Sequence, residues 1–102
     1  MNKLIIDTTE AKKTTIKLRS DRSLDAISEE NSPKSQVALI LINKLLKRNR
    51  INPTEIDEIE VNTGPGSFTG TRVGVAIANA LGFALDIPVN GKKSKQALPK
   101  YS

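Results

Sequence analysis

The sequence predicts one small α/β domain, and three observations lead to this prediction. Residues 59–62 alternate between apolar and polar side chains, as a half-buried strand does. A glycine-rich turn follows at 64–74, and an apolar run without proline then extends from Val73 to Leu85, which is long enough for a helix. Short alternating segments and a second helical pattern precede this unit. A chain of 102 residues fits one modest core and leaves no room for a second domain.

The first part of the chain predicts a meander of three strands. Residues 3–8 are expected to form a buried strand, because three consecutive apolar residues follow the initial lysine. The side chains of Asp7-Thr8-Thr9 bond readily to nearby backbone and favour a turn. Lys13 to Arg19 then alternates, and a second turn signal stands at Ser20-Asp21. Alternation resumes from Leu24 to about Ser28, which gives the third strand.

A long helix is predicted after the meander. A loop over Glu29–Ser35, rich in turn-forming residues, leads into a helical pattern at Gln36–Asn49, with Ser35 as the expected N-cap. Basic residues gather toward the end of this helix, where the helix dipole favours cations. Asn52-Pro53-Thr54-Glu55 then predicts a short helical turn capped by Thr54.

The second half completes the predicted domain. A fourth strand is expected at about Glu58–Thr63, and the second long helix at Thr69–Leu85. Ile87–Asn90 is short and apolar enough for a fifth strand. The organisation that follows is a single domain at 1–91 with a basic tail at 92–102.

The glycine-rich turn between fourth strand and second helix has two interpretations. Unpaired amides at a helix start attract phosphate or carboxylate groups, so the turn could bind an anion. Known phosphate loops do not match it in detail, because Gly70 lies four residues after Gly66 and Thr71 stands where a P-loop needs lysine. Tight packing of helix on strand is the default interpretation. The residues concerned are Gly64, Pro65, Gly66, Ser67, Phe68, Thr69 and Gly70.

Composition excludes several kinds of chemistry. The chain has no Cys and no His, so thiol nucleophiles, Cys/His zinc sites and a Ser-His-Asp triad are excluded. Its formal charge of +5 resides mainly in the tail, where four of the sixteen basic residues lie; the remaining twelve almost balance the eleven acidic residues. The first apolar run is too short for a signal peptide or a membrane span. We expect a cytoplasmic protein that does not enter a membrane.

Both long helices are apolar over more than one face. In the second, Asn79 is the only clearly polar residue over three turns, and a helix that is apolar all round is normally buried all round. Gly70, Gly74, Ala78 and Gly82 form a series of small residues at four-residue spacing, which lets another helix approach closely. Packing within the chain accounts for these residues equally well, but not for the total apolar surface. The sequence therefore predicts a helix-mediated oligomer.

These patterns coincide with a resemblance to a known family. The chain resembles the bacterial TsaB family, also called YeaZ, which helps make threonylcarbamoyladenosine next to the anticodon of tRNA. A GPGSFTG-x-R-x-G run is highly specific to that family, and the resemblance extends over nearly the whole chain. The residues that carry it are Leu4-Ile5-Ile6-Asp7-Thr8-Thr9-Glu10, Gly64-Pro65-Gly66-Ser67-Phe68-Thr69-Gly70-Thr71-Arg72-Val73-Gly74, Ala80-Leu81-Gly82 and Ile87-Pro88-Val89.

The resemblance implies a fold. It is one lobe of the actin-like/Hsp70-like ATPase (ribonuclease H-like) fold, with a five-stranded mixed sheet of order 3-2-1-4-5 and two long helices. Family members usually carry a second lobe beyond the position of Gly91, whereas this sequence stops at Ser102. The resemblance implies that nucleotide binding in the usual manner needs a cleft between two lobes, and the sequence leaves open whether it is a naturally minimal form or the first lobe of a longer protein.

The resemblance also implies a role. Family members look like non-catalytic relatives of TsaD, the subunit that transfers the threonylcarbamoyl group, and bind it through the two helices, while the ATPase TsaE joins the complex. No cofactor is implied for this chain alone; ATP or ADP with magnesium belongs to the complex, and so does tRNA. A homodimer is possible in isolation. Carried over by position, the partner interface comprises Val37, Leu41, Leu45, Arg72, Gly74, Ala78, Leu81 and Gly82.

Two competing functions stay open at this point. Asp7, Thr8 and Thr9 match the first phosphate-hairpin position of the ATPase superfamily, so a small nucleotide-binding ATPase-like enzyme could use Asp7 with the Gly64–Gly70 turn. In the TsaB family that site is degenerate, which favours Asp7 as a turn-former. An RNA-binding module could use the basic tail, but such runs are usually solvated, and the three aromatic residues form no stacking platform.

Overall fold

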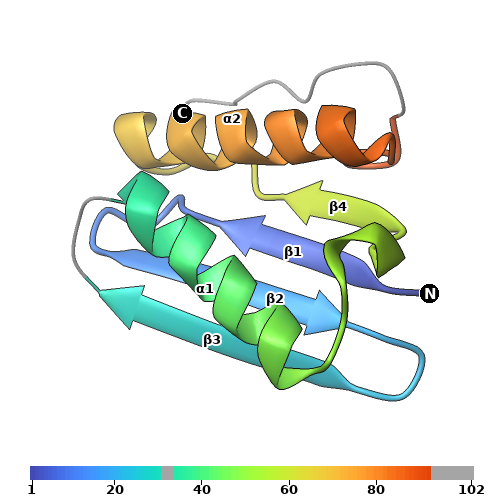
Figure 1. Cartoon of the computed structure of the whole chain (residues 1–102). Coiled ribbons are helices and arrows are strands. Elements are labelled where there is room, and N and C mark those ends of the chain that lie inside the picture. Colours follow the sequence, from blue (N-terminus) through green and yellow to red (C-terminus); the bar gives the residue numbers. More distant parts are fainter. Residues whose placement is uncertain (31–33, 93–102) are drawn as a thin grey trace.

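The computed structural model describes residues 1–30 and 34–92 as four strands and two long helices (Figure 1). A single 3-10 turn, η1, precedes the last strand. In chain order the elements are β1 (Lys3–Asp7), β2 (Lys13–Arg19), β3 (Leu24–Glu30), α1 (Lys34–Arg48), η1 (Pro53–Glu55), β4 (Glu58–Val61) and α2 (Phe68–Leu85). The predicted α/β class and each predicted element up to the second helix are confirmed.

The sheet has the order β3-β2-β1-β4. Strands β1, β2 and β3 pair in antiparallel fashion, and β1 pairs with β4 in parallel. The parallel register places Leu4 opposite Ile59 and Ile6 opposite Val61. The alternating pattern thus sends matching apolar residues of neighbouring strands to one side of the sheet.

The predicted fifth strand is wrong, since among the described residues the sheet has four strands. Val89 makes only an isolated parallel bridge to Ile59. The backbone of Asn90 is left-handed, with φ of 51°, and a tight turn then joins Val89 to Lys92 by two backbone hydrogen bonds. The side chain of Asn90 continues the ladder instead, because it accepts from Val61 N at 2.8 Å and donates to Val61 O at 3.0 Å. The chain turns away before a strand can extend.

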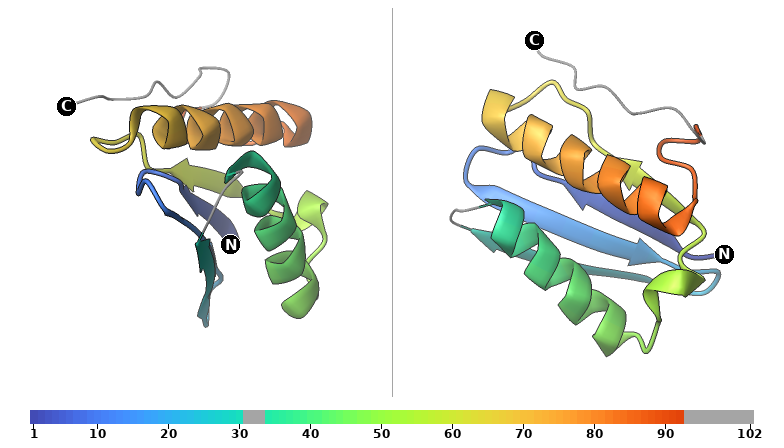
Figure 2. Two further views of the ribbon diagram at one scale, coloured as in Figure 1. Left: turned by 90° about the vertical axis from the view of Figure 1, so that its left-hand side faces the viewer. Right: turned by 45° about the horizontal axis from the view of Figure 1, so that its top comes forward.

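Both helices cover the same face of the sheet. Figure 2 shows α1 crossing over β2 and β3, with α2 lying along β4 and β1. The apolar residues of alternate strand positions meet the helices here and form one core. Its members are Leu4, Ile6, Ile16, Leu18, Ala38, Leu41, Ile42, Leu45, Leu46, Ile56, Ile59, Val61, Val75, Ala78 and Val89.

Several predicted boundaries move by one or two residues. Helix α1 begins at Lys34, before the predicted Gln36, so the expected N-cap Ser35 is wrong and lies inside the helix. Helix α2 begins at Phe68 with Ser67 as its N-cap. The expected cap of η1, Thr54, is wrong: Asn52 caps the turn, because its side chain accepts from Thr54 N at 3.2 Å. The Glu55 side chain in turn accepts a hydrogen bond from Asn52 N, which completes a capping box. Of the predicted tail, all but Lys92 lies outside the described residues.

Candidate functional site

The glycine turn packs directly on the segment that follows β1. Ser67 N donates to Thr9 O at 2.7 Å, and Thr8 Oγ1 donates to Gly70 O in a short hydrogen bond. A Cβ at Gly66 would lie 2.7 Å from Thr9 Cβ and 2.8 Å from Thr9 O, closer than real contacts allow. Backbone approach to the neighbouring segment is therefore sufficient reason for glycine here.

Three amides of the glycine turn and the first turn of α2 have acceptors within the same segment. Gly64 N donates to Asn62 Oδ1 at 3.0 Å, and Gly70 N donates to Ser67 Oγ at 3.2 Å. Thr71 N donates to Ser67 O at 2.9 Å. Because these donors are used internally, the contacts favour the packing interpretation of this turn. Anion binding stays a prediction, with Pro65, Phe68 and Thr69 exposed beside it.

Asp7 holds the segment that the turn packs against. Its Oδ1 accepts from Thr9 N at 2.9 Å and Thr9 Oγ1 at 2.7 Å, and its Oδ2 accepts from Asn62 Nδ2 at 3.2 Å. Partial burial would raise the pKa of Asp7, but these hydrogen bonds and the charge of Lys17 outweigh it and lower the pKa below the usual value. An ionised Asp7 is therefore engaged as a turn-former, in the role that the sequence favoured.

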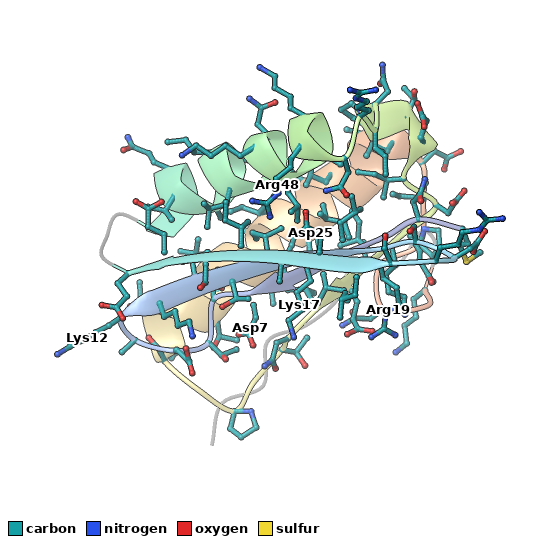
Figure 3. All side chains as sticks on the ribbon, turned by 90° about the horizontal axis from the view of Figure 1, so that it is seen from below. Asp7, Lys12, Lys17, Arg19, Asp25 and Arg48 are labelled. Carbon is teal, nitrogen blue, oxygen red and sulfur yellow. The ribbon has the colours of Figure 1, made fainter. Side chains whose placement is uncertain are left out.

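Asp7 also borders a groove on the face of the sheet that no described helix covers. Figure 3 shows Asp7 and Lys17 on the side of the sheet away from the helices. The groove has a volume of about 660 Å³. Lys3 lies in it between two carboxylates, 3.6 Å from Glu58 and 3.3 Å from Glu60. No group of three potential metal ligands occurs among residues 1–30 and 34–92.

The described geometry offers no activated nucleophile at the turn. Ser67 is the N-cap of α2, with its Oγ accepting from Gly70 N, and the sequence contains no histidine that could serve as its base. Thr8 is fully buried, and its hydroxyl hydrogen bonds to the backbone of α2. These hydroxyl groups hold the turn in place, which is a structural task.

Most of the residues predicted to face a partner lie in the core, so that part of the predicted interface is wrong as a surface. Leu41, Leu45 and Ala78 are 1%, 0% and 0% exposed. A Cβ at Gly74 would collide with the Thr8 hydroxyl, and one at Gly82 with Val89. The reason is the phase of each helix, because these residues lie on the side that faces the sheet. Among the others, Val37 and Leu81 are half-buried and Arg72 is exposed.

Apart from Arg72, the sequence prediction missed the exposed surface on the opposite side of both helices. Phe83 is 91% exposed, and Leu39 and Ile40 are about half exposed at 52% and 51%. On α2 the exposed Ala76 and Ala80 lie between the larger exposed side chains of Arg72 and Phe83. We define the outer helix face as Leu39, Ile40, Lys44 and Lys47 of α1 with Phe68, Arg72, Ala76, Ala80 and Phe83 of α2, all of them exposed.

The outer helix face confirms that α2 has more apolar surface than its sheet covers. A helical wheel centred on the buried stripe would have located these residues, since they lie opposite it. The prediction of excess apolar surface holds for only the first half of α1, because the exposed Leu39 and Ile40 are followed by the exposed Lys44 and Lys47. Helix α2 is also long and apolar enough to span a membrane, yet core helices pass the same test. Here α2 lies against β1 and β4, and its Gly74 and Gly82 contact Thr8 and Val89.

Comparisons with known proteins agree with one another. The family model of TsaD, tRNA N6-adenosine threonylcarbamoyltransferase, matches residues 29–99. A protein of Bacillus subtilis named tRNA threonylcarbamoyladenosine biosynthesis protein TsaB is 38% identical over 61 residues, which are 60% of this chain and 27% of that protein. The chain therefore spans about a quarter of this relative.

Solved structures give the same result for the fold. YeaZ from Pseudomonas aeruginosa superposes with a TM-score of 0.83 at 27% identity, over 87% of this chain and 43% of that one. A second structure from the same organism, described as an uncharacterized protein with similarity to peptidase YeaZ, gives 0.82 at 27% identity, over 86% and 41%. The four described strands and two helices thus correspond to less than half of either relative.

Proposed function

The chain belongs to the family of tRNA N6-adenosine threonylcarbamoyltransferases and, within it, to the TsaB (YeaZ) proteins; on that premise we propose that it is a non-catalytic subunit in threonylcarbamoyladenosine synthesis. In this proposal it positions or activates a TsaD-like catalytic subunit by docking through its two long helices. The modified base lies next to the anticodon of tRNA. The chain itself transfers no group.

The observation that carries the proposal is the exposed outer helix face. Phe83 is almost fully exposed, and Ala76 and Ala80 leave a shallow surface beside it. Exposed apolar residues that cluster on one side of a small protein are typical of interaction sites. Figure 2 shows both helices on the same side of the molecule, so one partner surface can contact them together. Two helices on one side of a sheet can pack against another helical pair.

Further partners follow from the same proposal. A TsaE-like ATPase joins the complex of the two related subunits, and tRNA is held by the assembled complex rather than by this chain. The chain needs no cofactor of its own, and ATP or ADP with magnesium acts only in the complex. The place of action is the cytoplasm. A homodimer of the isolated chain is the competing use of the same face.

The ATPase-like alternative is less well supported. It requires Asp7 to hold a metal-bound nucleotide, but the carboxylate already accepts three hydrogen bonds from Thr9 and Asn62. A phosphate-binding turn also needs free amides, and several amides of this turn donate internally. ATP hydrolysis that the Asp7→Asn variant loses would establish this alternative instead.

Co-expression with the TsaD-like protein of the same organism tests the proposal. We expect the two proteins to co-elute in gel filtration, and the Ala76→Arg variant to remain folded but to elute alone, because a long charged side chain cannot enter a close helix contact. The matched control is Ala26→Arg, an exposed alanine that pairs with Lys17 on the opposite face of the sheet. The proposal fails if wild type does not co-elute, or if Ala76→Arg co-elutes as the control does.

A further inference from the structure

The sheet has two outer strands, and each has backbone groups that point away from its neighbour. With the order β3-β2-β1-β4, β3 and β4 lie at the two edges, as Figure 1 shows. Alternate residues of an edge strand direct their N–H and C=O groups outward, where these groups can pair with a strand of another chain. What occupies the outward groups therefore decides whether the sheet can be extended.

On β3 the outward groups of Ala26 are occupied by side chains. Ala26 N donates to Asp25 Oδ1 at 2.9 Å, and Ala26 O accepts from Arg48 Nη2 at 3.2 Å. Arg48 also donates to both carboxylate oxygens of Asp25, each at 2.9 Å (Figure 3). Asn49 Nδ2 donates to the same carboxylate at 2.9 Å. We call these contacts the edge clasp; they join the end of α1 to the middle of the edge strand and comprise Asp25, Ala26, Arg48 and Asn49.

Charge on β3 acts in the same direction as the edge clasp. Hydrogen bonds from Arg48 and then Asn49 hold the pKa of Asp25 below its usual value, so its carboxylate stays an acceptor at neutral pH. The strand carries three acidic residues and no basic one. In an antiparallel pair of β3 strands centred on Ile27, Asp25 of each copy would lie opposite Glu29 of the other, and like charges there oppose pairing.

The other edge of the sheet is closed by a different side chain. Ile59 of β4 has backbone partners, since its N donates to Pro88 O at 2.9 Å and its O accepts from Asn90 N at 2.8 Å. At Val61, two residues along the strand, the Asn90 side chain supplies both partners, at 2.8 Å from Val61 N and 3.0 Å from Val61 O. An asparagine amide carries a donor and an acceptor side by side, so it can take the place of one peptide group. The outward groups of both β4 residues are thus used within the chain.

We propose that the edge clasp and the Asn90 amide close the two edges of the sheet and thereby prevent a strand of a second copy from extending it. The inference goes beyond the proposed function, because it concerns the edges of the sheet and not the helices. Two unrelated side-chain arrangements satisfy the same kind of outward backbone pair, one at each edge. Opening the edge clasp should let β3 of one chain pair with β3 of another, because this seven-residue strand is the longer of the two edges.

Opening the edge clasp is the first test, in a chain that also carries Ala76→Arg so that contacts through the helices do not contribute. The clasp variant is Asp25→Ala/Arg48→Ala. Its matched control is Lys47→Ala/Glu29→Ala, which removes one charge of each sign from the same helix and strand, and with it the like-charge pair, but leaves the edge clasp intact. At about 200 µM, sedimentation velocity should give the clasp variant about twice the monomer mass or more, and the control the monomer mass.

Hydrogen exchange of single amides, measured by NMR, locates the contact. In dilute solution the Ala26 amide of the clasp variant should exchange faster than that of the control, and in concentrated solution it should slow down as the edge becomes paired. Asn90→Gly tests the other edge, because glycine accepts the left-handed backbone at this position but has no amide side chain. The Val61 amide should then lose its protection, while the Ile59 amide, which donates to a backbone carbonyl, keeps it.

Three results would overturn the inference. A clasp variant that stays monomeric like its control contradicts it, and so does association that leaves exchange of the Ala26 amide unchanged, because the contact then lies elsewhere. Unchanged protection of the Val61 amide in Asn90→Gly contradicts the closure of β4. Circular dichroism shows whether each variant keeps the fold. Where Asn90→Gly does not, Asn90→Asp replaces it, and faster exchange of the Val61 amide is expected there too, because a carboxylate oxygen would lie against Val61 O.

Discussion

The two sides of α2 are made of the same kinds of residue but have opposite environments. Ala78 on the inner side is 0% exposed, while Ala76 and Ala80 on the outer side are exposed. Gly74 and Gly82 touch Thr8 and Val89, so they serve the contact with this chain's own sheet. The comparison teaches that small residues in a helix identify a close contact without identifying which chain makes it.

Helix α1 repeats the contrast with a different outer side. Its inner stripe of leucines is buried like that of any core helix, and its outer side changes from Leu39 and Ile40 to Lys44 and Lys47 along its length. An α1 face that ends in lysines beside an apolar α2 face is asymmetric in charge.

The largest expected difference in stability is between arginine substitutions at Ala78 and Ala76, which lie on opposite sides of α2. Ala78→Arg places a charge in the core without a partner and should lower the free energy of unfolding by about 3–5 kcal/mol, enough to unfold a domain of this size. Ala76→Arg should change the same free energy by no more than about 0.5 kcal/mol. Urea titration followed by circular dichroism measures both. Equal stability of the two variants would contradict the assigned phase of α2.

Truncation of leucines makes the corresponding comparison on α1. Leu45→Ala should destabilise the fold by about 2–5 kcal/mol, because it removes a fully buried side chain and leaves a cavity. Leu39→Ala removes a half-exposed side chain and should cost about 0.5 kcal/mol or less. Thermal unfolding under identical conditions distinguishes them. A larger cost at Leu39 would mean that the outer side is already buried, as in a stable dimer.

A substitution of Gly82, on the inner side of α2, should lower the free energy of unfolding by a smaller amount, and a second substitution at Val89 tests the cause. Gly82→Ala places a methyl group against Val89 and should cost about 1–3 kcal/mol by overpacking. Adding Val89→Ala should make the glycine substitution cheaper than it is in wild type, which a double-mutant cycle of urea titrations measures. On the outer side, Ala80→Gly should cost about 1 kcal/mol through helix propensity alone. Additive effects at the two inner sites would show that they do not touch.

The smallest effect concerns the turn segment beneath the glycine motif. Because the folded state lowers the pKa of Asp7, its stabilisation is complete above the unfolded value of 3.8 and is lost as pH falls through the lower folded value. Asp7→Asn should therefore cost about 1 kcal/mol at neutral pH and less at acid pH. Urea titration at several pH values measures this. A cost that does not shrink toward acid pH would contradict the role assigned to the carboxylate.

Sequence patterns located most of the fold. The alternation in β1, β2, β3 and β4 and the glycine turn before α2 predicted the element order, and the family resemblance implied the sheet order through β4. The fifth strand was wrong because an apolar segment at 87–90 does not reveal the left-handed backbone of Asn90. The cap of η1 was misplaced because Asn52 and Thr54 are both good capping residues at nearly the same position.

The candidate interface was only half predictable. Excess apolar surface was apparent from composition, since α2 has too few polar residues to face water on any side. The residues that form this surface could not be identified from the sequence, because Leu41 and Leu45 form as regular an apolar stripe as the residues on the outer side. The stripe on the sheet side is distinguished by contact with Ile16 and Leu18 of the core, and those contacts join distant parts of the chain.

By itself the sequence determined the order of elements, the glycine turn, the excess of apolar surface and the absence of histidine and cysteine chemistry. These are properties of local pattern and composition, which need no knowledge of neighbours. Only the tertiary structure decided which side of each helix stays exposed and that Gly74 and Gly82 pack on this chain. Helix phase against a sheet is fixed by contacts between distant segments, and one-dimensional patterns do not contain them.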